Sequence, residues 1–258
     1  MNKQTGFPYW YLLGEMTRVE FKLRDQGTLF GFLWTLLQPT LMFVVLYMLF
    51  IKWLGHFVSQ YGAYLLIGLV LWNFFQKATS MGLSSLKRRT SLIRNYRFPR
   101  EIVVFSAVLS VFVSSLLEML ILLPFLFLLG VRPNLAWLWI PLIVVILLAF
   151  VISVALFLAV FAAEFHDMER IWEVVTTALF YLTPIFYPLT IVGGWKRRLL
   201  SLNPLTIIIM NARACLIDGL TPRPYASLAV IFLTAIAFAG GVAFLRRCEH
   251  RFADTLIA

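Results

Sequence analysis

The sequence predicts an all-α, polytopic membrane protein, and three observations support this prediction. Of its 258 residues, 61% are hydrophobic and 13% are charged, with a mean hydropathy of +0.88, which lies outside the range of soluble domains. Apolar runs long enough to cross a bilayer recur along the chain. A dense basic run at residues 84–101 lies between two of them, so the positive-inside bias places it in the cytoplasm. We expect one domain over residues 1–258, with six transmembrane helices, an N-terminal amphipathic interface helix and a re-entrant helical pair between the fifth and sixth spans.

The first segment, residues 1–28, is expected to form the helix that lies in the membrane interface. Leu13 and Met16 belong to an apolar series at helical spacing, while Glu15 and Lys22 occupy the opposite face. A helix with one apolar and one charged face lies in the plane of the interface.

Two spans follow this helix. The first is expected at residues 31–54, with Pro39 tolerated inside it because neighbouring helices can satisfy the freed carbonyl. The second is expected at residues 61–79 and returns the chain to the cytoplasm at Lys77.

The basic loop at residues 84–101 mixes positive and apolar side chains. Leu92, Ile93 and Tyr96 lie among the charges and are unusual in a merely solvated turn. Two interpretations stay open. The loop is either a topology anchor that also touches anionic lipid headgroups, or a docking helix for a cytoplasmic partner.

The third and fourth spans are expected at residues 102–129 and 135–163. Glu118 lies in the outer half of the third span, where an ionisable group is costly unless it is paired or hydrated. We expect it to face the protein interior or a channel and to reach Arg213 or the backbone of the re-entrant helices. A carboxyl that tightens packing and one that contacts substrate both remain open.

A small charged loop around His166 and Asp167 precedes the fifth span, which is expected at residues 171–187. These two side chains can form an acid–base pair, but capping of the fifth span is favoured, since a helix N-terminus stabilises negative charge.

Residues 190–224 are too apolar for a solvated loop and too interrupted for a regular span. We expect two short helices, at residues 195–202 and 204–217, that dip into the outer face of the membrane. The hinge-like points of a moving gate, together with a charged residue of the second helix, are Gly193, Gly194, Asn203, Pro204 and Arg213.

The sixth span is expected at residues 225–245 and is followed by arginines 246, 247 and 251. The charge bias places this tail, and therefore both termini, in the cytoplasm. A seventh span at residues 190–224 would put those arginines outside, which favours six spans. Residues 196–198, Lys-Arg-Arg, lie outside in this topology and depart from the bias.

Several motifs are absent from the sequence. It contains no phosphate-binding loop, no His-Glu-x-x-His metal site and no Gly-x-Ser-x-Gly elbow. The three histidines fall in separate loops, so no metal site is expected. The net charge of +10 is explained by lipid orientation better than by nucleic-acid binding.

Motifs spread over nearly the whole chain resemble the membrane subunit of a type-2 ABC exporter, in the branch that moves O-antigen, capsule or teichoic-acid polymers. They are Gly-x-Leu-Trp at 31–34 with Pro39 soon after, Arg-Phe-Pro-Arg at 97–100, His-Asp-Met-Glu-Arg at 166–170, Tyr-Leu-Thr-Pro-Ile-Phe-Tyr at 181–187 and Asn-Pro-Leu at 203–205. His166 departs from the family pattern, in which an arginine often precedes the aspartate.

This resemblance implies a homodimeric permease in the bacterial cytoplasmic (inner) membrane that works with two separate ABC ATPase subunits. ATP and Mg would bind to those partners, with no cofactor on this chain, and the substrate would be a lipid-linked polysaccharide. The resemblance also implies that the interface helix rides on the ATPase and that the segment after Tyr187 forms periplasmic gate helices. The residues expected to couple the chain to the ATPase are Arg88, Arg89, Leu92, Ile93, Arg94, Tyr96 and Arg97.

Aromatic residues make up 16% of the chain, and several fall where a dimeric channel could run. Sugars present apolar C–H faces that stack on rings without fixed hydrogen bonds, which suits a sliding polymer. The alternative is that these rings are interface anchors or lipid-facing side chains. The expected channel and substrate residues are Trp34, Tyr47, Glu118, Phe180, Tyr181, Phe186 and Tyr187.

Other functions remain open at this stage. They are a membrane-embedded enzyme acting on lipid-linked sugars, a structural assembly factor, and an ABC exporter of a lipid or drug. An enzyme needs a paired acid and base at one depth of the membrane, and Glu118 has no evident partner in the sequence.

Overall fold

The computed structural model describes residues 8–24, 33–96 and 98–255, except for the side chains of residues 24, 33–35 and 249–255. This part of the chain is helical, with no β-strand among the described residues. Its α-helices are α1 (Tyr9–Arg24), α2 (Leu33–Leu54), α3 (Tyr61–Arg88), α4 (Thr90–Asn95), α5 (Glu101–Leu128), α6 (Ile140–Glu164), α7 (Met168–Leu182), α8 (Gly194–Leu202), α9 (Pro204–Arg213) and α10 (Pro224–Thr255). Short helical turns are η1 (Leu135–Trp139), η2 (Leu189–Ile191) and η3 (Ala214–Asp218).

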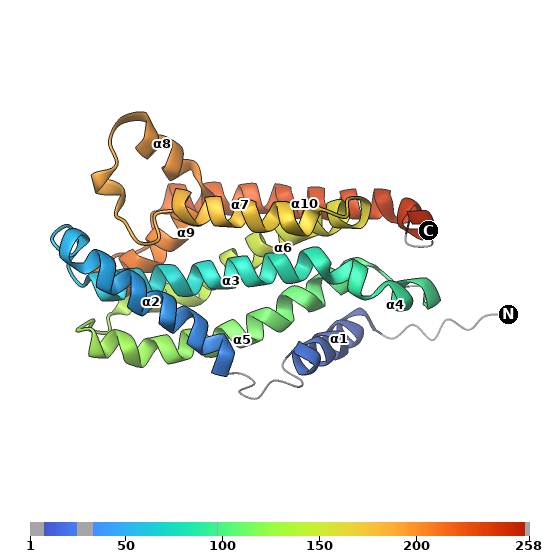
Figure 1. Ribbon diagram of the computed structural model, residues 1–258, viewed down its shortest axis with the longest axis horizontal. Helices are drawn as coiled ribbons and strands as arrows, with labels where there is room; N and C mark the ends of the chain where they lie inside the picture. The colour runs from blue at the N-terminus through green and yellow to red at the C-terminus, as the bar shows by residue number, and fades with distance from the viewer. Residues whose placement is uncertain (1–7, 25–32, 97, 256–258) are drawn as a thin grey trace.

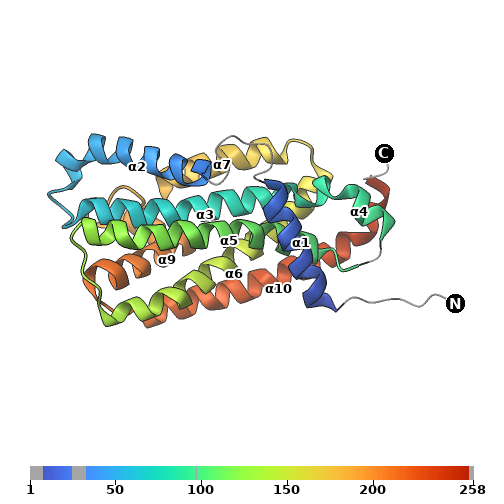
Figure 2. The ribbon, with the colours of Figure 1, turned by 90° about the horizontal axis from the view of Figure 1, so that it is seen from below.

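The long helices form one elongated bundle. α3, α5, α6, α7 and α10 follow its long axis, and α2 crosses α3 obliquely (Figure 1). α4 and the C-terminal end of α10 lie at one end of the bundle, while α8 lies at the other. In Figure 2, α1 runs across the bundle axis near the α4 end, as expected of an interface helix.

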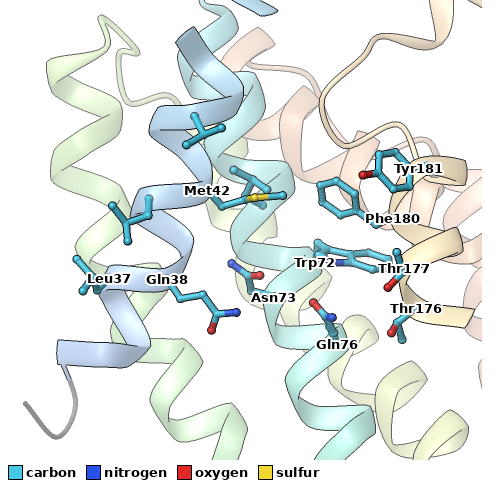
Figure 3. A pocket seen from close by; sticks show the side chains of 13 residues that line it. Leu37, Gln38, Met42, Trp72, Asn73, Gln76, Thr176, Thr177, Phe180 and Tyr181 are labelled. Atoms are coloured by element: carbon cyan, nitrogen blue, oxygen red, sulfur yellow. The ribbon is translucent and has the colours of Figure 1, made fainter. Parts of the chain in front are cut away.

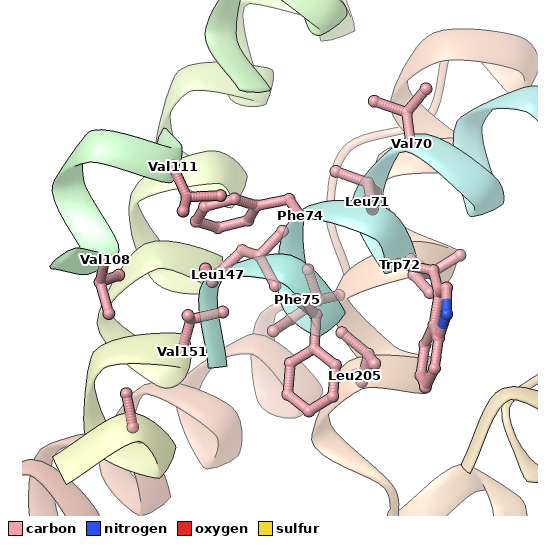
Figure 4. Packing of buried hydrophobic residues seen from close by; sticks show 14 of the residues in the cluster. Val70, Leu71, Trp72, Phe74, Phe75, Val108, Val111, Leu147, Val151 and Leu205 are labelled. Carbon is pink, nitrogen blue, oxygen red and sulfur yellow. The ribbon is translucent and has the colours of Figure 1, made fainter. Parts of the chain in front are cut away.

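α3 is the central helix and packs against α2, α5, α6, α7 and α9. Phe74 is fully buried and its ring centroid lies 5.6 Å from that of Phe112 on α5. Figure 4 shows Phe74 beside Val111, with Leu147 of α6 close by. Because lipid tails are as apolar as these side chains, close packing holds such helices together more than the hydrophobic effect does.

A glycine allows α3 and α6 to approach closely. A Cβ atom at Gly82 would lie 2.6 Å from the Cβ atom of Ala155. Any side chain at Gly82 would therefore push the two helices apart, and small residues at helix crossings are typical of membrane bundles.

Within the described part of the chain, four helical segments are long and apolar enough to cross a membrane by themselves: Leu36–Leu54, Glu101–Leu128, Leu135–Glu164 and Pro224–Cys248. The bent pair Gly194–Leu202 and Pro204–Asp218, with an angle of 89°, is a fifth candidate if it counts as one span. The six-span count is therefore approximate.

The two remaining bundle helices, α3 and α7, fall outside that set for different reasons. α3 has 28 residues, about 42 Å at the usual rise, so it is long enough to cross a membrane. It falls outside the set because polar side chains interrupt its apolar sequence. Its central position shields its polar side chains from lipid. α7 has 15 residues, about 22 Å, less than the roughly 30 Å thickness of the hydrocarbon core.

Two helices extend beyond the predicted spans, and one predicted helical range is wrong. α3 continues to Arg88, beyond the expected end of the second span near residue 79. The fifth span is not helical over residues 171–187, because α7 begins at Met168 and ends at Leu182. Its end falls where Thr183 takes an extended conformation, with φ −93° and ψ 133°, before Pro184. α10 continues to Thr255, beyond the predicted sixth span at 225–245, while its candidate membrane span is Pro224–Cys248.

Ion pairs tie the transverse helix and the end of the bundle together. The Glu20 carboxylate of α1, 5% exposed, accepts a hydrogen bond of 2.7 Å from Nε of Arg89. Nη1 of Arg88 lies 4.0 Å from the same carboxylate. At the start of α5, Glu101 accepts a bond of 2.6 Å from Nη2 of Arg246 on α10. Polar contacts therefore join four helices at this end.

Candidate functional site

A groove of about 750 Å³ that combines polar and aromatic side chains lies between α2, α3 and α7 and is called here the α2–α7 groove. Figure 3 shows Gln38, Asn73 and Gln76 around the same space, with Trp72 and Phe180 on the α7 side. Its lining residues are Leu37, Gln38, Leu41, Met42, Val45, Leu69, Trp72, Asn73, Gln76, Thr176, Thr177, Phe180 and Tyr181.

The described lining of the α2–α7 groove is largely apolar, with several amide and hydroxyl groups and no charged side chain. Gln38, Asn73 and Gln76 offer amide donors and acceptors. Asn73 is 8% exposed, and its Nδ2 has no hydrogen-bond partner among the described residues. A buried amide without a partner costs free energy, so this side chain is suited to bonding a ligand that enters the groove. Amides beside rings fit a neutral ligand that carries both hydroxyl groups and apolar C–H faces.

An aromatic cluster lies next to the end of the α2–α7 groove at the C-terminus of α7, which is the outer end in the expected topology. The ring of Phe186 lies 5.2 Å from that of Phe50 on α2 and 5.9 Å from that of Phe180 on α7, between centroids. Tyr181 and Tyr187 meet it edge-on, at 6.2 and 5.1 Å. These distances are those of favourable aromatic pairs.

The structure therefore brings together four of the residues expected in the channel: Phe180, Tyr181, Phe186 and Tyr187. Tyr47 lies apart from them, stacked between Phe43 and Tyr61 where α2 meets α3. Trp34 belongs to α2, but its side chain lies outside the described residues.

Glu118 faces the protein interior, as expected, but its expected partner is wrong. Its Oε1 lies 3.3 Å from Nζ of Lys77 on α3, and its side chain is 2% exposed. The pair joins α3 to α5. Glu118 also lines a second cavity of about 220 Å³, between α2, α3 and α5, on the other side of α2 from the α2–α7 groove.

Arg213 bonds to backbone carbonyls rather than to Glu118. Its guanidinium donates to three backbone carbonyls, those of Tyr64, Pro184 and Ile185. No carboxylate among the described residues lies within ion-pair distance of it. Arg213 therefore fixes backbone rather than balancing a buried acid.

The expected hinge residues surround the two ends of α8. Gly194 has φ +63°, a conformation that favours glycine, and Gly193 is its N-terminal neighbour. Asn203 caps α9 by accepting a bond of 3.0 Å from the amide of Leu205, and its Nδ2 donates to Thr183. Pro204 is the first residue of α9, where a missing N–H costs nothing. α8 has no buried residue, so its contacts leave it at the surface.

The residues expected to couple to an ATPase divide into two groups. Arg88 and Arg89 face Glu20 of α1. Leu92 and Ile93 of α4 are half-buried, whereas Arg94 and Tyr96 are exposed. Arg97 lies outside the described residues.

The sequence prediction missed the amides of the α2–α7 groove. Asn73 and Gln76, three residues apart on one helix face, and Gln38 on the preceding span interrupt otherwise apolar segments. An amide inside an apolar span is costly in lipid, and this signal could have identified them.

Fold and groove together define a helical, multi-pass membrane protein with a bent helical pair and with an aromatic, amide-bearing groove whose described lining carries no charge. The family model for the ABC-2 type transporter matches residues 11–217, and the chain belongs to this family. It is similar to an O-antigen export system permease protein RfbA of Klebsiella pneumoniae, 28% identical over 95% of each chain. It is also similar to the RfbA permease of Myxococcus xanthus, 28% identical over 97% of each chain.

Proposed function

We propose that this chain is the membrane-spanning subunit of an ATP-driven exporter that moves an O-antigen-type, lipid-linked polysaccharide across the bacterial inner membrane. Similarity to the two RfbA permeases over nearly their full length supports the substrate class. Membership of a transporter family supports transport rather than enzymatic chemistry on lipid-linked sugars.

The α2–α7 groove is the observation that carries this proposal. Amides bond sugar hydroxyl groups, and rings stack on the apolar faces of sugar rings. The absence of charge from its lining residues suits a long polymer, because no single site holds one repeat tightly. Sulfated or strongly acidic polymers fit this lining less well, since its described residues include no cation.

A second copy of the chain is proposed to complete the groove. α2 presents an exposed apolar stripe at helical spacing, with Leu41 55%, Val45 52% and Met48 72% exposed. This stripe continues from the groove lining. Two chains that meet along α2 would enclose a path between them, which one bundle of this size cannot provide.

ATP hydrolysis is proposed to occur on two separate ABC ATPase subunits that bind at the α4 end. The exposed Arg94 and Tyr96 then contact the ATPase, and α1 lies beside them through the Glu20–Arg89 pair. Both termini lie in the cytoplasm in this arrangement.

Export in cells tests the proposal. The chain is produced with its ATPase in a bacterial host that makes a lipid-linked O-polysaccharide but lacks the exporter, and surface polymer is measured with whole-cell antibody binding. We expect surface polymer with the wild-type chain. Polymer that stays inside the cells despite a co-purifying ATPase would overturn the proposed substrate.

A matched pair of tyrosine variants ties export to the groove. Tyr181, 62% exposed in the groove, and Tyr225, 88% exposed on α10, are both replaced by Leu. The double variant Tyr181→Leu, Asn73→Leu should lower surface polymer about tenfold. This factor corresponds to about 1.4 kcal/mol on the rate-limiting barrier. Tyr225→Leu should leave it unchanged, and equal losses in both variants would exclude the groove as the path.

A further inference from the structure

The turn that follows α7 has an unusual backbone. Residues 183–188 form no regular helix, yet Thr183 and Ile185 are fully buried. Carbonyl groups of such a segment lack helical partners. Inside a membrane protein an unsatisfied carbonyl is costly, so irregular backbone persists only where side chains or water satisfy it.

Three side chains satisfy four successive carbonyls of this turn. Arg213 donates to Pro184 O at 2.7 Å through Nη1 and to Ile185 O at 2.6 Å through Nη2. The Tyr61 hydroxyl donates to Phe186 O at 2.9 Å. The Tyr64 hydroxyl donates to Tyr187 O at 3.1 Å. We call Arg213, Tyr61 and Tyr64 the carbonyl clamp.

Arg213 is committed to the carbonyl clamp at considerable cost. It is 4% exposed and has no acidic partner among the described residues. Its Nε donates to Tyr64 O at 3.0 Å, and its Cζ lies 3.4 Å from the centroid of the Tyr64 ring. A buried guanidinium is tolerated when carbonyl dipoles and an aromatic face replace its hydration. The planar fork is needed because its nitrogens reach separate carbonyls.

Gly68 leaves the space for this guanidinium. A Cβ atom at Gly68 would overlap Nη2 of Arg213 and lie 3.0 Å from Ile185 O. The turn, α3 and α9 therefore meet at a point where no larger residue fits.

α2 forms the wall of the groove opposite α7, and it has cavities beside it. The inner half of α2 lines a cavity on each side, the α2–α7 groove and the smaller cavity next to α5. Farther along α2, the ring of Phe50 packs against that of Phe186 in the clamped turn. Segments with few packed neighbours open at lower free energy than well-packed ones.

We propose that Arg213, Tyr61 and Tyr64 are positioning residues that hold Phe186 as a fixed wall at the outer end of the α2–α7 groove, so that this end opens by movement of α2 and Phe50. The role of that end as an exit rests on the proposed export function. The clamp does not touch the substrate. It fixes the position of Phe186, so α2 is the wall of the groove that moves.

Thiol labelling measures the position of residue 186 without any need for transport. Phe186→Cys is introduced into a chain in which Cys215 and Cys248 are replaced by Ala, and a membrane-impermeant maleimide is added to the intact transporter complex in membranes. Arg213→Met should raise the labelling rate about tenfold, the factor expected when hydrogen bonds of this strength are lost from a closed state. Arg213→Lys should restore part of the protection, because an ammonium can bond some of the carbonyls.

Two further variants separate positioning from general loss of folding. Tyr61→Phe and Tyr64→Phe each remove one hydroxyl and keep the ring, so they fold and should raise labelling several-fold. Gly68→Ala should act like Arg213→Met and add little to it when the two are combined, because both changes break the same contacts. Arg223→Met, at an exposed arginine, is the matched control and should change nothing.

Unchanged labelling in the Tyr61→Phe and Tyr64→Phe chains would overturn the proposal, and these two decide it if the Arg213 variants are not recovered in membranes. Additive effects of Gly68→Ala and Arg213→Met would overturn it as well. If labelling changes as expected while no strain shows surface polysaccharide, the clamp stands and the export function fails.

Discussion

At the scale of single residues, the Lys77–Glu118 pair shows how a charge is kept inside the bundle. The carboxylate is almost fully buried, while the lysine is 24% exposed. A lone charge at this depth is costly, but an ion pair joining α3 to α5 offsets much of that cost. The pair therefore adds a fixed contact between two helices without adding net charge.

Removing one partner of the Lys77–Glu118 pair should lower the free energy of unfolding more than removing both partners. Glu118→Leu leaves Lys77 without its carboxylate and should lower the free energy of unfolding by about 3–5 kcal/mol. The Lys77→Met, Glu118→Leu chain should recover most of that loss, because neither charge remains. Thermal unfolding of the purified protein in lipid nanodiscs measures both. Strictly additive losses would show that the two side chains act separately.

At the scale of elements, the basic segment after α3 is divided between an internal contact and an exposed surface. Arg88 and Arg89 are engaged with Glu20 of α1. Arg94 and Tyr96 of the following segment contact solvent. Burial raises the pKa of the Tyr9 hydroxyl at the start of α1, and the nearby Glu101 carboxylate adds to the rise. α1 is thus seated against the bundle beside the exposed residues that we propose bind the ATPase.

Substitutions in the exposed part of this segment should uncouple ATP hydrolysis from polymer export. Arg94→Glu, or Tyr96→Ala, should reduce export at least about tenfold, a loss of about 1.4 kcal/mol in coupling, while the chain still inserts. ATPase activity and surface polymer are measured in the same membranes. Lys196→Glu on α8, at the other end of the bundle, serves as the control. Normal export by the Arg94 and Tyr96 variants would leave the segment as a lipid anchor alone.

At the scale of the whole molecule, the polar ends and the α2 stripe suggest how copies and membrane are arranged. The α4 end carries α1, the basic segment and the C-terminal part of α10 (Figure 1). α8 lies at the opposite end with a basic triplet at 196–198. The exposed stripe of α2 is available to a second copy of the chain.

Disulfide cross-linking tests the proposed dimer. Met48→Cys, in the chain without its native cysteines, should form a dimer on oxidation and block export, with recovery after reduction. Phe232→Cys is equally exposed, at 69%, but lies on α10 in the layer opposite α2, and should not cross-link. Full export by a dimer locked through residue 48 would place the path elsewhere.

Reporter fusions test the predicted topology. A reporter active only in the periplasm should be silent after Ala258 and active when inserted after Ser201 of α8. The arginines at 246, 247 and 251 are the physical reason for the first outcome. Activity after Ala258 would reverse the orientation.

Composition and apolar runs were sufficient to predict an all-α membrane fold, the transverse helix and the bent pair. Helix ends were harder. Lys77 looked like an interface residue because its partner, Glu118, is 41 residues away in the chain, and no spacing rule connects them. The end of α7 was misplaced because Phe186 and Tyr187 are as apolar as the helix before them, although Pro184 marked the break.

The candidate site was predictable only in part. Aromatic residues 180–187 form a sequence cluster and meet in space. Asn73, Gln76 and Gln38 come from two helices, and their common cavity depends on the oblique crossing of α2, which composition does not encode. The clamp contacts join residues separated by 28 to 149 positions. Such contacts follow from tertiary packing rather than from local pattern.

The uncharged lining of the α2–α7 groove has a consequence for chain length. A polymer that meets many weak, similar contacts experiences an almost level free-energy profile, because each repeat leaves one contact as the next repeat forms the same one. For the proposed substrate, friction then rises with the number of repeats inside the protein rather than with the length of the whole chain. Short and long glycans should pass at the same rate per sugar, and the length distribution at the cell surface should reflect synthesis rather than export.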